Sequence, residues 1–216
     1  MSIILRLSIF LNPSIDMKLL ELFSGTGSVG RVAKRLGWEV ISLDLKNADI
    51  ATDILNWDFK ETYEPKHFDF VWASPPCTEY SIAKTTGHRN IEQANKIVLK
   101  TLEIIDYLKP RFFVLENPQT GYLKNQPFMD NRRYSDIDYC KYGTPYRKRT
   151  RLWNNLEKWT PRKLCKYDCG NTVGKRHPAS AQKGASGKWG DDRNYQTNEL
   201  YVIPEALILE LLDATT

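Results

Sequence analysis

The stretch Lys18–Leu45, "KLLELFSGTGSVGRVAKRLGWEVISLDL", decides the fold. Its first six residues, Lys18–Phe23, form an apolar run that predicts a buried strand, and the glycine-rich turn "SGTGSVG" follows directly. A short helix comes next, and Gly37 ends it. Trp38–Leu45 then predicts a second strand, which carries Asp44 near its end. A strand, a helix and another strand in this order are typical of an α/β fold with a parallel sheet.

Further apolar runs continue this alternation. Phe68–Ala73 and Arg111–Glu116 predict buried strands. Ile91–Leu108 predicts a helix, because its apolar residues recur at helical spacing and Pro110 follows. The runs "DIDYC" and "RTRLWNNL" predict two more strands. We therefore expect an α/β fold with a mostly parallel, twisted sheet, in which ligands bind beyond the carboxyl ends of the strands.

The 216 residues suffice for one domain with a single core. Residues 1–16 are expected to form an N-terminal extension and residues 17–156 the main α/β domain. Residues 157–200 are rich in Gly, Lys, Arg and small polar residues, which predicts a short basic segment as a small C-terminal appendage. Residues 201–216 are expected to form a closing strand and helix that pack back on the main domain.

Composition excludes several classes of protein. A net charge of +5, with 41% hydrophobic and 26% charged residues, is typical of a globular protein and suits a polyanionic partner. Four cysteines are too few and too unevenly spaced for a disulfide scaffold, which favours a reducing cytoplasm. No segment predicts a membrane span, and residues 1–16 lack the cleavage site of a signal peptide. We expect a cytoplasmic protein with no membrane partner.

Polar or reactive side chains stand at the ends of four predicted strands. The glycine-rich turn follows the first, and Asp44 lies at the end of the second. "SPPC" places Cys77 behind two prolines that stiffen the loop after the third, and "LENP" places Glu116 at the end of the fourth. Each has a plainer explanation alone: a tight turn, a helix cap, a small buried thiol and a capped carboxylate. Together they predict one site at the carboxyl edge of the sheet.

These motifs resemble those of the DNA (cytosine-5)-methyltransferases, in a short form. "LELFSGTGSVG" resembles the family's S-adenosyl-L-methionine (AdoMet) loop, "SPPCTEYS" its catalytic Pro-Cys loop and "LENP" its Glu-Asn motif. "YGTPYRKRTRLW" resembles its Tyr-Gly-x-Pro and Arg-x-Arg segment. The order and rough spacing match from Lys18 to Trp153. The resemblance implies a Rossmann-like AdoMet-dependent methyltransferase fold, with residues 17–156 as the catalytic domain.

The resemblance also implies how the reaction proceeds. Cys77 would add to C6 of a cytosine flipped out of duplex DNA, so that C5 can attack the methyl group of AdoMet. Glu116 would hold N3 and the exocyclic amine as charge develops. Arg149 and Arg151 would support the flipped ring and the thiolate. The expected activity is AdoMet-dependent methylation of cytosine C5 in DNA.

The cofactor residues are implied in the same way. The adenine would pack on Phe23, the ribose would bind Asp44, and Pro75 would shape the pocket for methyl transfer. The full implied set is Phe23, Ser24, Gly25, Thr26, Gly27, Asp44, Asp53, Ile54 and Pro75.

The sequence departs from the family's pattern at three places. Pro118 follows the Glu-Asn pair, where the family usually has Val. Three residues, Tyr146–Lys148, precede the Arg pair, one more than usual, so Lys148 could take the role of Arg149. The region for target recognition is almost absent, and "GNTV" at Gly170 lies too early to be the family's last motif. The recognition sequence is therefore not predicted.

Two features of the basic segment suggest further roles. Cys165, Cys169 and His177, with Cys140 as a fourth ligand, have spacings that suit a structural zinc site, although unrelated thiols would give the same pattern. The stretch Lys163–Arg193 is predicted to contact nucleic acid. Its basic residues are Lys163, Lys166, Lys175, Arg176, Lys183, Lys188 and Arg193, and Trp189 could stack or wedge; the alternative is a solvated loop.

Other functions share parts of this pattern. Methyltransferases of exocyclic amines also follow a glycine loop with "SPP", although an aromatic residue normally comes next, and Cys77 and "LEN" argue against them. RNA could replace DNA as the substrate, because the chemistry is the same. A non-catalytic nucleic-acid-binding module is a further alternative. A restriction-modification role, and the host cytoplasm as the location if the source is a virus or phage, complete the expectations.

Overall fold

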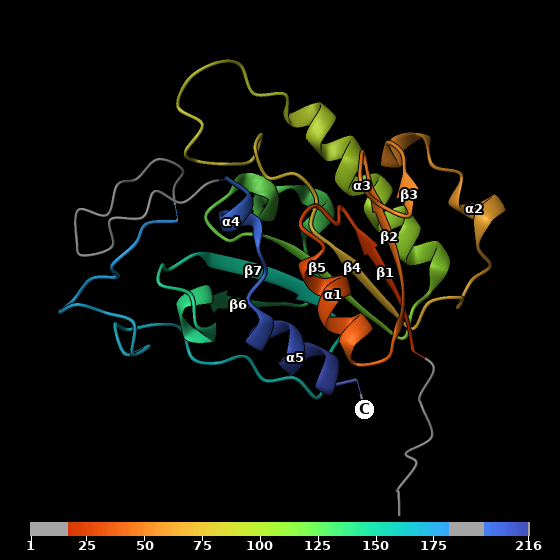
Figure 1. Ribbon diagram of the computed structural model, residues 1–216. Coiled ribbons are helices and arrows are strands. Elements are labelled where there is room, and N and C mark those ends of the chain that lie inside the picture. The colour runs from red at the N-terminus through yellow and green to blue at the C-terminus, as the bar shows by residue number, and fades with distance from the viewer. Residues whose placement is uncertain (1–16, 182–196, 216) are drawn as a thin grey trace, which may run out of the picture.

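The computed structural model describes residues 17–181 and 197–215. The extension expected over residues 1–16 lies outside the described residues. The described chain forms a mixed α/β sandwich around one seven-stranded sheet (Figure 1). The strands are β1 (Lys18–Leu22), β2 (Glu39–Asp44), β3 (Ile50–Ala51), β4 (Phe70–Ala73), β5 (Phe112–Pro118), β6 (Tyr134–Asp138) and β7 (Arg149–Asn154). The helices are α1 (Ser28–Arg35), α2 (Phe59–Thr62), α3 (Ile91–Leu108), α4 (Thr197–Tyr201) and α5 (Glu205–Asp213), with 3-10 turns η1 (Ile54–Asn56), η2 (Tyr122–Asn125), η3 (Pro127–Met129) and η4 (Tyr139–Tyr142).

The sheet is mostly parallel, as the sequence predicts. Its strand order is β3-β2-β1-β4-β5-β7-β6. The first five strands in this order pair in parallel, whereas β7 pairs antiparallel with both β5 and β6. The carboxyl ends of β1, β2, β4 and β5 therefore share one edge of the sheet, where the predicted site residues stand.

Helices cover both faces of the sheet because its buried strands alternate side chains between two apolar clusters. On β1, Leu19 packs with α1 and α5 on one face, and Leu20 packs with α3 on the other. The α3 bounds agree with the predicted helix. It begins where the Asn90 side chain accepts a hydrogen bond from the Gln93 N–H, and it ends at Lys109 in the left-handed conformation.

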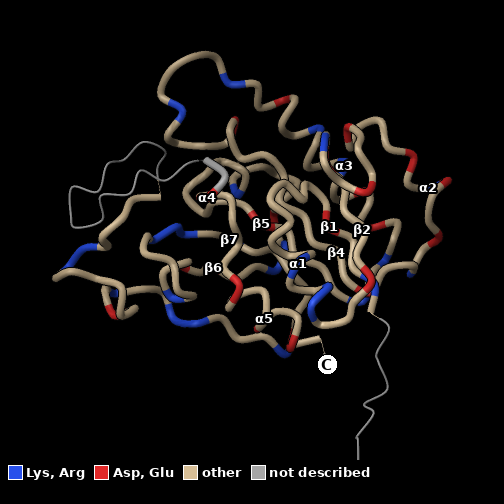
Figure 2. Tube along the Cα trace, viewed as in Figure 1, with Lys and Arg blue, Asp and Glu red and all other residues tan. Residues whose placement is uncertain are grey.

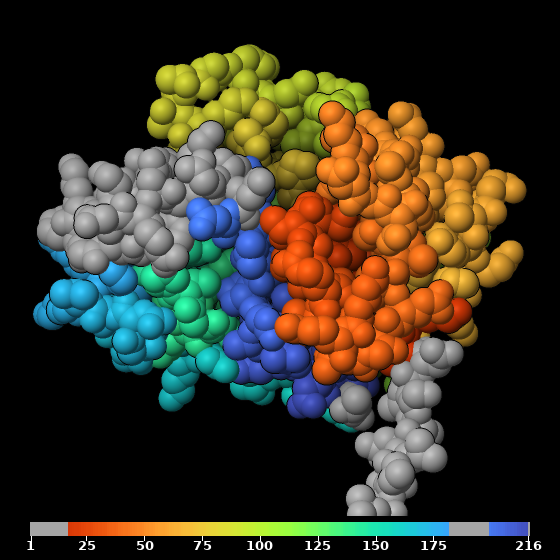
Figure 3. All heavy atoms as spheres, viewed as in Figure 1, coloured from red at the N-terminus to blue at the C-terminus, as the bar shows by residue number. Residues whose placement is uncertain are grey.

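The closing segment differs from the prediction. The strand expected after residue 200 does not form: Tyr201 ends α4, Val202–Pro204 has no regular structure, and α5 follows. Pro204 has no N–H to donate, and the Ile203 N–H donates to the Ser28 hydroxyl (3.2 Å) instead of to a strand. The helix α5 lies directly against α1 (Figure 3).

None of the helices in the described parts of the chain is long and apolar enough to cross a membrane.

Candidate active site

A cavity of about 350 Å³ opens at the carboxyl ends of the parallel strands. This volume is within the usual range of small-molecule sites, about 300–1,000 Å³. The predicted residues that line it come from the glycine loop, the ends of β2, β4 and β5, and η1. They are Phe23, Ser24, Gly25, Thr26, Asp44, Asp53, Ile54, Pro75, Cys77 and Glu116. Gly27, Arg149 and Arg151 are not among its lining residues.

The loop between β1 and α1 is shaped by glycine. Gly25 and Gly27 have φ values of 49° and 63°, in the left-handed region that a side chain disfavours. The Gly25 N–H donates to Asp44 Oδ2 (2.8 Å), which ties this loop to the end of β2. The backbone of the loop therefore forms one wall of the cavity.

A buried carboxylate, which sequence reasoning missed, supports this loop. Glu21 on β1 accepts hydrogen bonds from the N–H groups of Val29 (3.2 Å) and Gly30 (2.9 Å) in the first turn of α1. Burial raises the pKa of Glu21 to about 7, although these bonds lower it. A Cβ on Gly30 would lie 2.5 Å from Glu21 Oε2, so glycine is needed there for close approach. The apolar run around Glu21 was the signal that this acid is buried.

Two carboxylates line the part of the cavity next to the glycine loop and η1. Asp44 and Asp53 both line it. Asp53 also caps η1, because its side chain accepts a hydrogen bond from the Leu55 N–H (2.9 Å). AdoMet carries an amine, ribose hydroxyls, an ammonium group and a cationic sulfonium, which such carboxylates complement. The residues present therefore fit this cofactor.

Cys77 follows the two prolines on the cavity wall and is partly buried. Asn117 holds the loop from β5, because its amide donates to the Pro75 carbonyl (2.9 Å). Burial, and secondarily the charge of Glu116, raise the pKa of the Cys77 thiol, whereas Lys148 lowers it. Without substrate, the balance therefore favours the neutral thiol at neutral pH.

Glu116 is 6% exposed at the carboxyl end of β5. It accepts a hydrogen bond from the Tyr139 hydroxyl (3.1 Å), and Lys148 Nζ lies 3.7 Å from the same oxygen. Lys148 lines the cavity together with Glu116 and Cys77. The cavity thus brings a thiol, a carboxylate and an ammonium group together at one end.

Arg149 and Arg151, which are predicted to support the ring and the thiolate, do not line the cavity. Each forms a two-point ion pair with the residue opposite it on β6: Arg149 with Asp138 (2.8 and 3.0 Å) and Arg151 with Asp136 (2.7 and 2.9 Å). Asp138 is fully buried, and a buried carboxylate needs such a partner. Lys148, one residue earlier, takes the place by the cavity.

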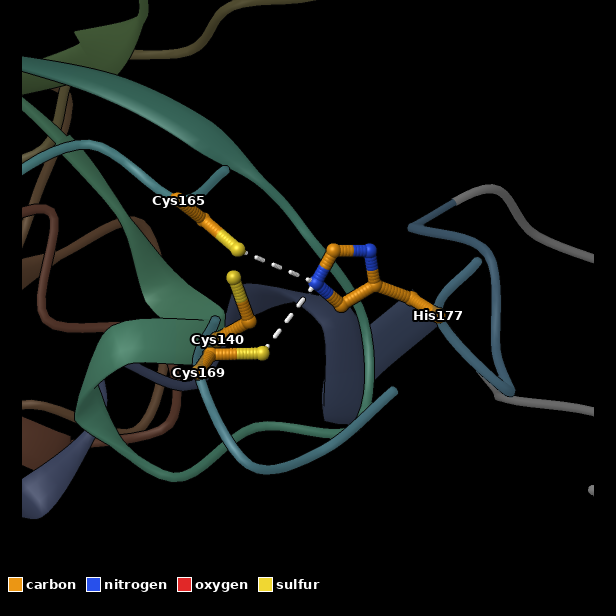
Figure 4. Close-up of side chains that lie close together, drawn as sticks. All are labelled: Cys140, Cys165, Cys169 and His177. Carbon is orange, nitrogen blue, oxygen red and sulfur yellow. Dashed lines mark hydrogen bonds between the residues drawn. The ribbon is translucent and has the colours of Figure 1, made fainter. Parts of the chain in front are cut away.

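The four predicted metal ligands come together outside this cavity. Cys140 in η4, Cys165, Cys169 and His177 place their ligand atoms within 4.8 Å of one another. Figure 4 shows the three thiols and the His177 ring converging on one point.

Only part of the basic stretch predicted to contact nucleic acid lies among the described residues. Lys183, Lys188, Trp189 and Arg193 lie outside the described residues. Among the described ones, Lys175 and Arg176 line a shallow pocket of about 400 Å³ with Arg147. Figure 2 shows Lys and Arg recurring along this part of the chain.

Comparison with known proteins gives the family. The model of the C-5 cytosine-specific DNA methylases matches residues 17–127, just over half of the chain. A Frog virus 3 (isolate Goorha) protein named "Probable DNA (cytosine-5)-methyltransferase" is 37% identical over 219 residues, which cover 91% of this chain and 99% of the viral protein. The chain belongs to the C-5 cytosine-specific DNA methylase family. The resemblance stated from the motifs is thereby confirmed.

The methylase fold is also shared with a solved structure. A crystal structure of an E. coli prophage protein, described as a "putative DNA modification methyltransferase", matches with a TM-score of 0.50 and 16% sequence identity. The match covers 69% of this chain and 52% of the prophage protein. This methylase therefore spans about half the length of that relative, and the predicted methyltransferase fold is confirmed.

The sequence did not predict the residue that supports Glu116 or the part of the cavity wall that comes from the closing segment. Tyr139 holds Glu116, and its position directly after β6 gave no separate signal. Tyr201 and Ile203 complete the wall from the closing segment. The residues of "YVIP" form no sequence pattern that would indicate a contact with the glycine loop.

Proposed function

We propose that this protein methylates C5 of cytosine in DNA, with AdoMet as the methyl donor. The observation that carries the proposal is the meeting of Cys77, Glu116 and Lys148 at one end of the cofactor-sized cavity. A family defined by C-5 cytosine methylation supports it.

Cys77 is proposed as the nucleophile. When its thiolate adds to C6 of the target cytosine, the C5=C6 double bond opens and electron density moves to C5, the atom that is methylated. Once C5 carries the methyl group, loss of the C5 proton to water restores the double bond and releases the thiolate. The prolines before Cys77 and the hydrogen bond from Asn117 to the Pro75 carbonyl support the nucleophile's position.

Glu116 and Lys148 are proposed to control charge in the same pocket. Glu116 would accept hydrogen bonds from the cytosine amine and from protonated N3, which stabilises the ring as Cys77 adds. Binding of that ring would also offset the Glu116 charge that raises the pKa of Cys77. The thiolate would therefore form when substrate is present, and the positive charge of Lys148 would favour it.

AdoMet supplies the methyl group, which is electrophilic because it is bonded to the positively charged sulfonium. We propose that Asp44 holds the ribose hydroxyls, that Asp53 and Ile54 meet the adenine, and that the backbone of Ser24–Gly27 approaches the methionine part. Pro75 and Phe23 would form the apolar walls.

DNA is the proposed partner, with the target base flipped into the cavity. The basic residues around the shallow pocket, Arg147, Lys175 and Arg176, support a contact with backbone phosphates. The restriction-modification role and the cytoplasmic location stay predictions.

The test is to incubate the purified protein with AdoMet and long unmethylated DNA, and then to identify the modified nucleoside. We expect 5-methylcytosine, mapped by bisulfite sequencing. N4-methylcytosine as the product would favour the amine-directed alternative, and methylation of RNA alone would change the substrate class. AdoMet binding without any product would favour a non-catalytic module.

Replacing Lys148 tests whether this residue takes the role that the family's pattern gives to Arg149. We expect Lys148→Met to lower methylation about 10²-fold at neutral pH, a loss typical for one charge-stabilising group. The pKa of Cys77 should rise further without Lys148, so activity should recover only at higher pH. The measurement is a pH–rate profile.

Lys96→Met is the matched control, because Lys96 forms a solvent-exposed pair with Glu92 on α3. This variant should keep the wild-type profile. An unshifted profile in Lys148→Met would remove Lys148 from the catalytic group.

A further inference from the structure

The segment 160–181 has almost no apolar core of its own. It contains no helix or strand, and Cys165 is its only buried residue. In Figure 3 it forms a projection at the edge of the molecule. So few buried side chains cannot offset the entropy lost on ordering the chain, and small units of this kind usually need a disulfide or a metal.

The cluster of Cys140, Cys165, Cys169 and His177 joins this segment to the catalytic domain. Cys140 comes from η4, which directly follows β6, whereas the other three ligands belong to the segment. His177 Nε2 lies 3.6 Å from Cys165 Sγ and 3.4 Å from Cys169 Sγ. Thiolate and imidazole ligands around a tetrahedral Zn²⁺ are separated by about 3.5 Å, as its bond lengths require. All four cysteines of the chain are free, so no disulfide performs this function.

Neighbouring groups orient the ligands, as they do around protein-bound metals. The Tyr167 N–H donates to Cys165 Sγ (3.3 Å), and the Cys165 N–H donates to Asp138 Oδ2 (2.9 Å). The Asn171 amide donates to the Cys140 carbonyl (3.4 Å). The first two bonds restrain Cys165 within a segment that has no regular structure, and the third ties that segment to Cys140 in η4.

We propose that Cys140, Cys165, Cys169 and His177 bind one Zn²⁺ in a closed, structural site. Three thiolates and one imidazole fill the tetrahedral positions, so no position is open for substrate or water. The ion would replace the missing core and fasten segment 160–181 to η4.

The site would also connect to the reaction centre. Cys140 follows Tyr139, whose hydroxyl donates a hydrogen bond to Glu116, so a proposed ligand is the chain neighbour of a residue that supports the cavity. Lys175 and Arg176 directly precede His177. Binding of His177 to the metal would therefore also restrain the positions of these two basic side chains. This second effect, on DNA contact, rests on the proposed function; metal binding itself does not.

Metal analysis of the full chain, purified without chelator, tests the proposal. We expect about one zinc per chain. Cys169→Ser and His177→Ala should lose it, whereas His177→Cys should keep it because the fourth thiolate restores the ligand set. Cys77→Ala is the matched cysteine control and should keep full zinc content.

Two further measurements use the wild-type protein, so they do not depend on whether a variant folds. Cobalt substituted into the wild-type protein should give thiolate-to-cobalt charge-transfer absorption and tetrahedral bands. Removing zinc with a chelator should speed tryptic cleavage within segment 160–181, while AdoMet still raises the melting temperature.

Wild-type protein with free thiols and no metal, even after incubation with zinc, would overturn the proposal, as would full zinc content in both loss variants. Bound zinc without methylation would leave this proposal intact and refute the proposed function.

Discussion

Cys77→Ala is expected to reduce DNA methylation to background, because no other described thiol lines the cavity. The same variant should lose covalent capture of DNA. If 5-fluorocytosine replaces cytosine throughout a long DNA, no recognition sequence needs to be known. Fluorine cannot leave C5 as a cation, so the methylated adduct of the wild-type protein persists as a denaturation-resistant band that requires AdoMet.

The control for this variant is cofactor binding. Cys77 is not proposed as an AdoMet contact, so AdoMet should raise the melting temperature of Cys77→Ala nearly as much as that of the wild type. Methylation that survives in Cys77→Ala would exclude the covalent route and bring the amine-methylation alternative forward.

Glu116→Gln is expected to lower kcat by about 10²–10³-fold, the usual cost of removing one preorganised stabilising group. Glutamine keeps the shape and can still accept the hydrogen bond from Tyr139. The Glu116 charge raises the pKa of Cys77, so its loss should lower that pKa and speed alkylation of the thiol by iodoacetamide. Methylation and thiol reactivity should therefore change in opposite directions.

Tyr139→Phe is the matched comparison, because it removes the hydrogen bond and leaves the Glu116 charge. It should cost less activity than Glu116→Gln and should not speed alkylation. If Glu116→Gln slowed both reactions equally, a general disturbance of the pocket would explain the loss better than charge.

The sheet and most of the cavity could be predicted because local patterns specify them. Apolar runs of strand length, Gly37 and the helical spacing of 91–108 each act within a few residues. The ends of parallel strands then meet by geometry, which brings Asp44, Cys77 and Glu116 to one edge.

The ion pairs of Arg149 and Arg151 depend on a long-range pairing of strands. Asp136 and Asp138 occur two residues apart, as do the two arginines, and strands with this spacing present both charges on one face. The antiparallel register of β6 and β7 sets each acid opposite a base. The matching spacing was visible in the sequence, but the register that joins the two runs was not.

The closing strand was wrong for a related reason. Residues 201–203 have a strand-like composition, but β1, the strand before the glycine loop, already pairs with β2 on one side and with β4 on the other. The available surface was the start of α1, where Ile203 meets Ser28. Local composition does not reveal which surface a segment will reach.

The contact between Ile203 and Ser28 joins residues 175 positions apart and determines when the cofactor site is complete. During translation the glycine loop is synthesised early, whereas Tyr201 and Ile203, which form another wall of the cavity, are synthesised much later. Contacts over such separations form late, because a long loop must first be closed. A chain made only as far as residue 200 would therefore lack this wall, and its cavity would stay open on the side of the glycine loop.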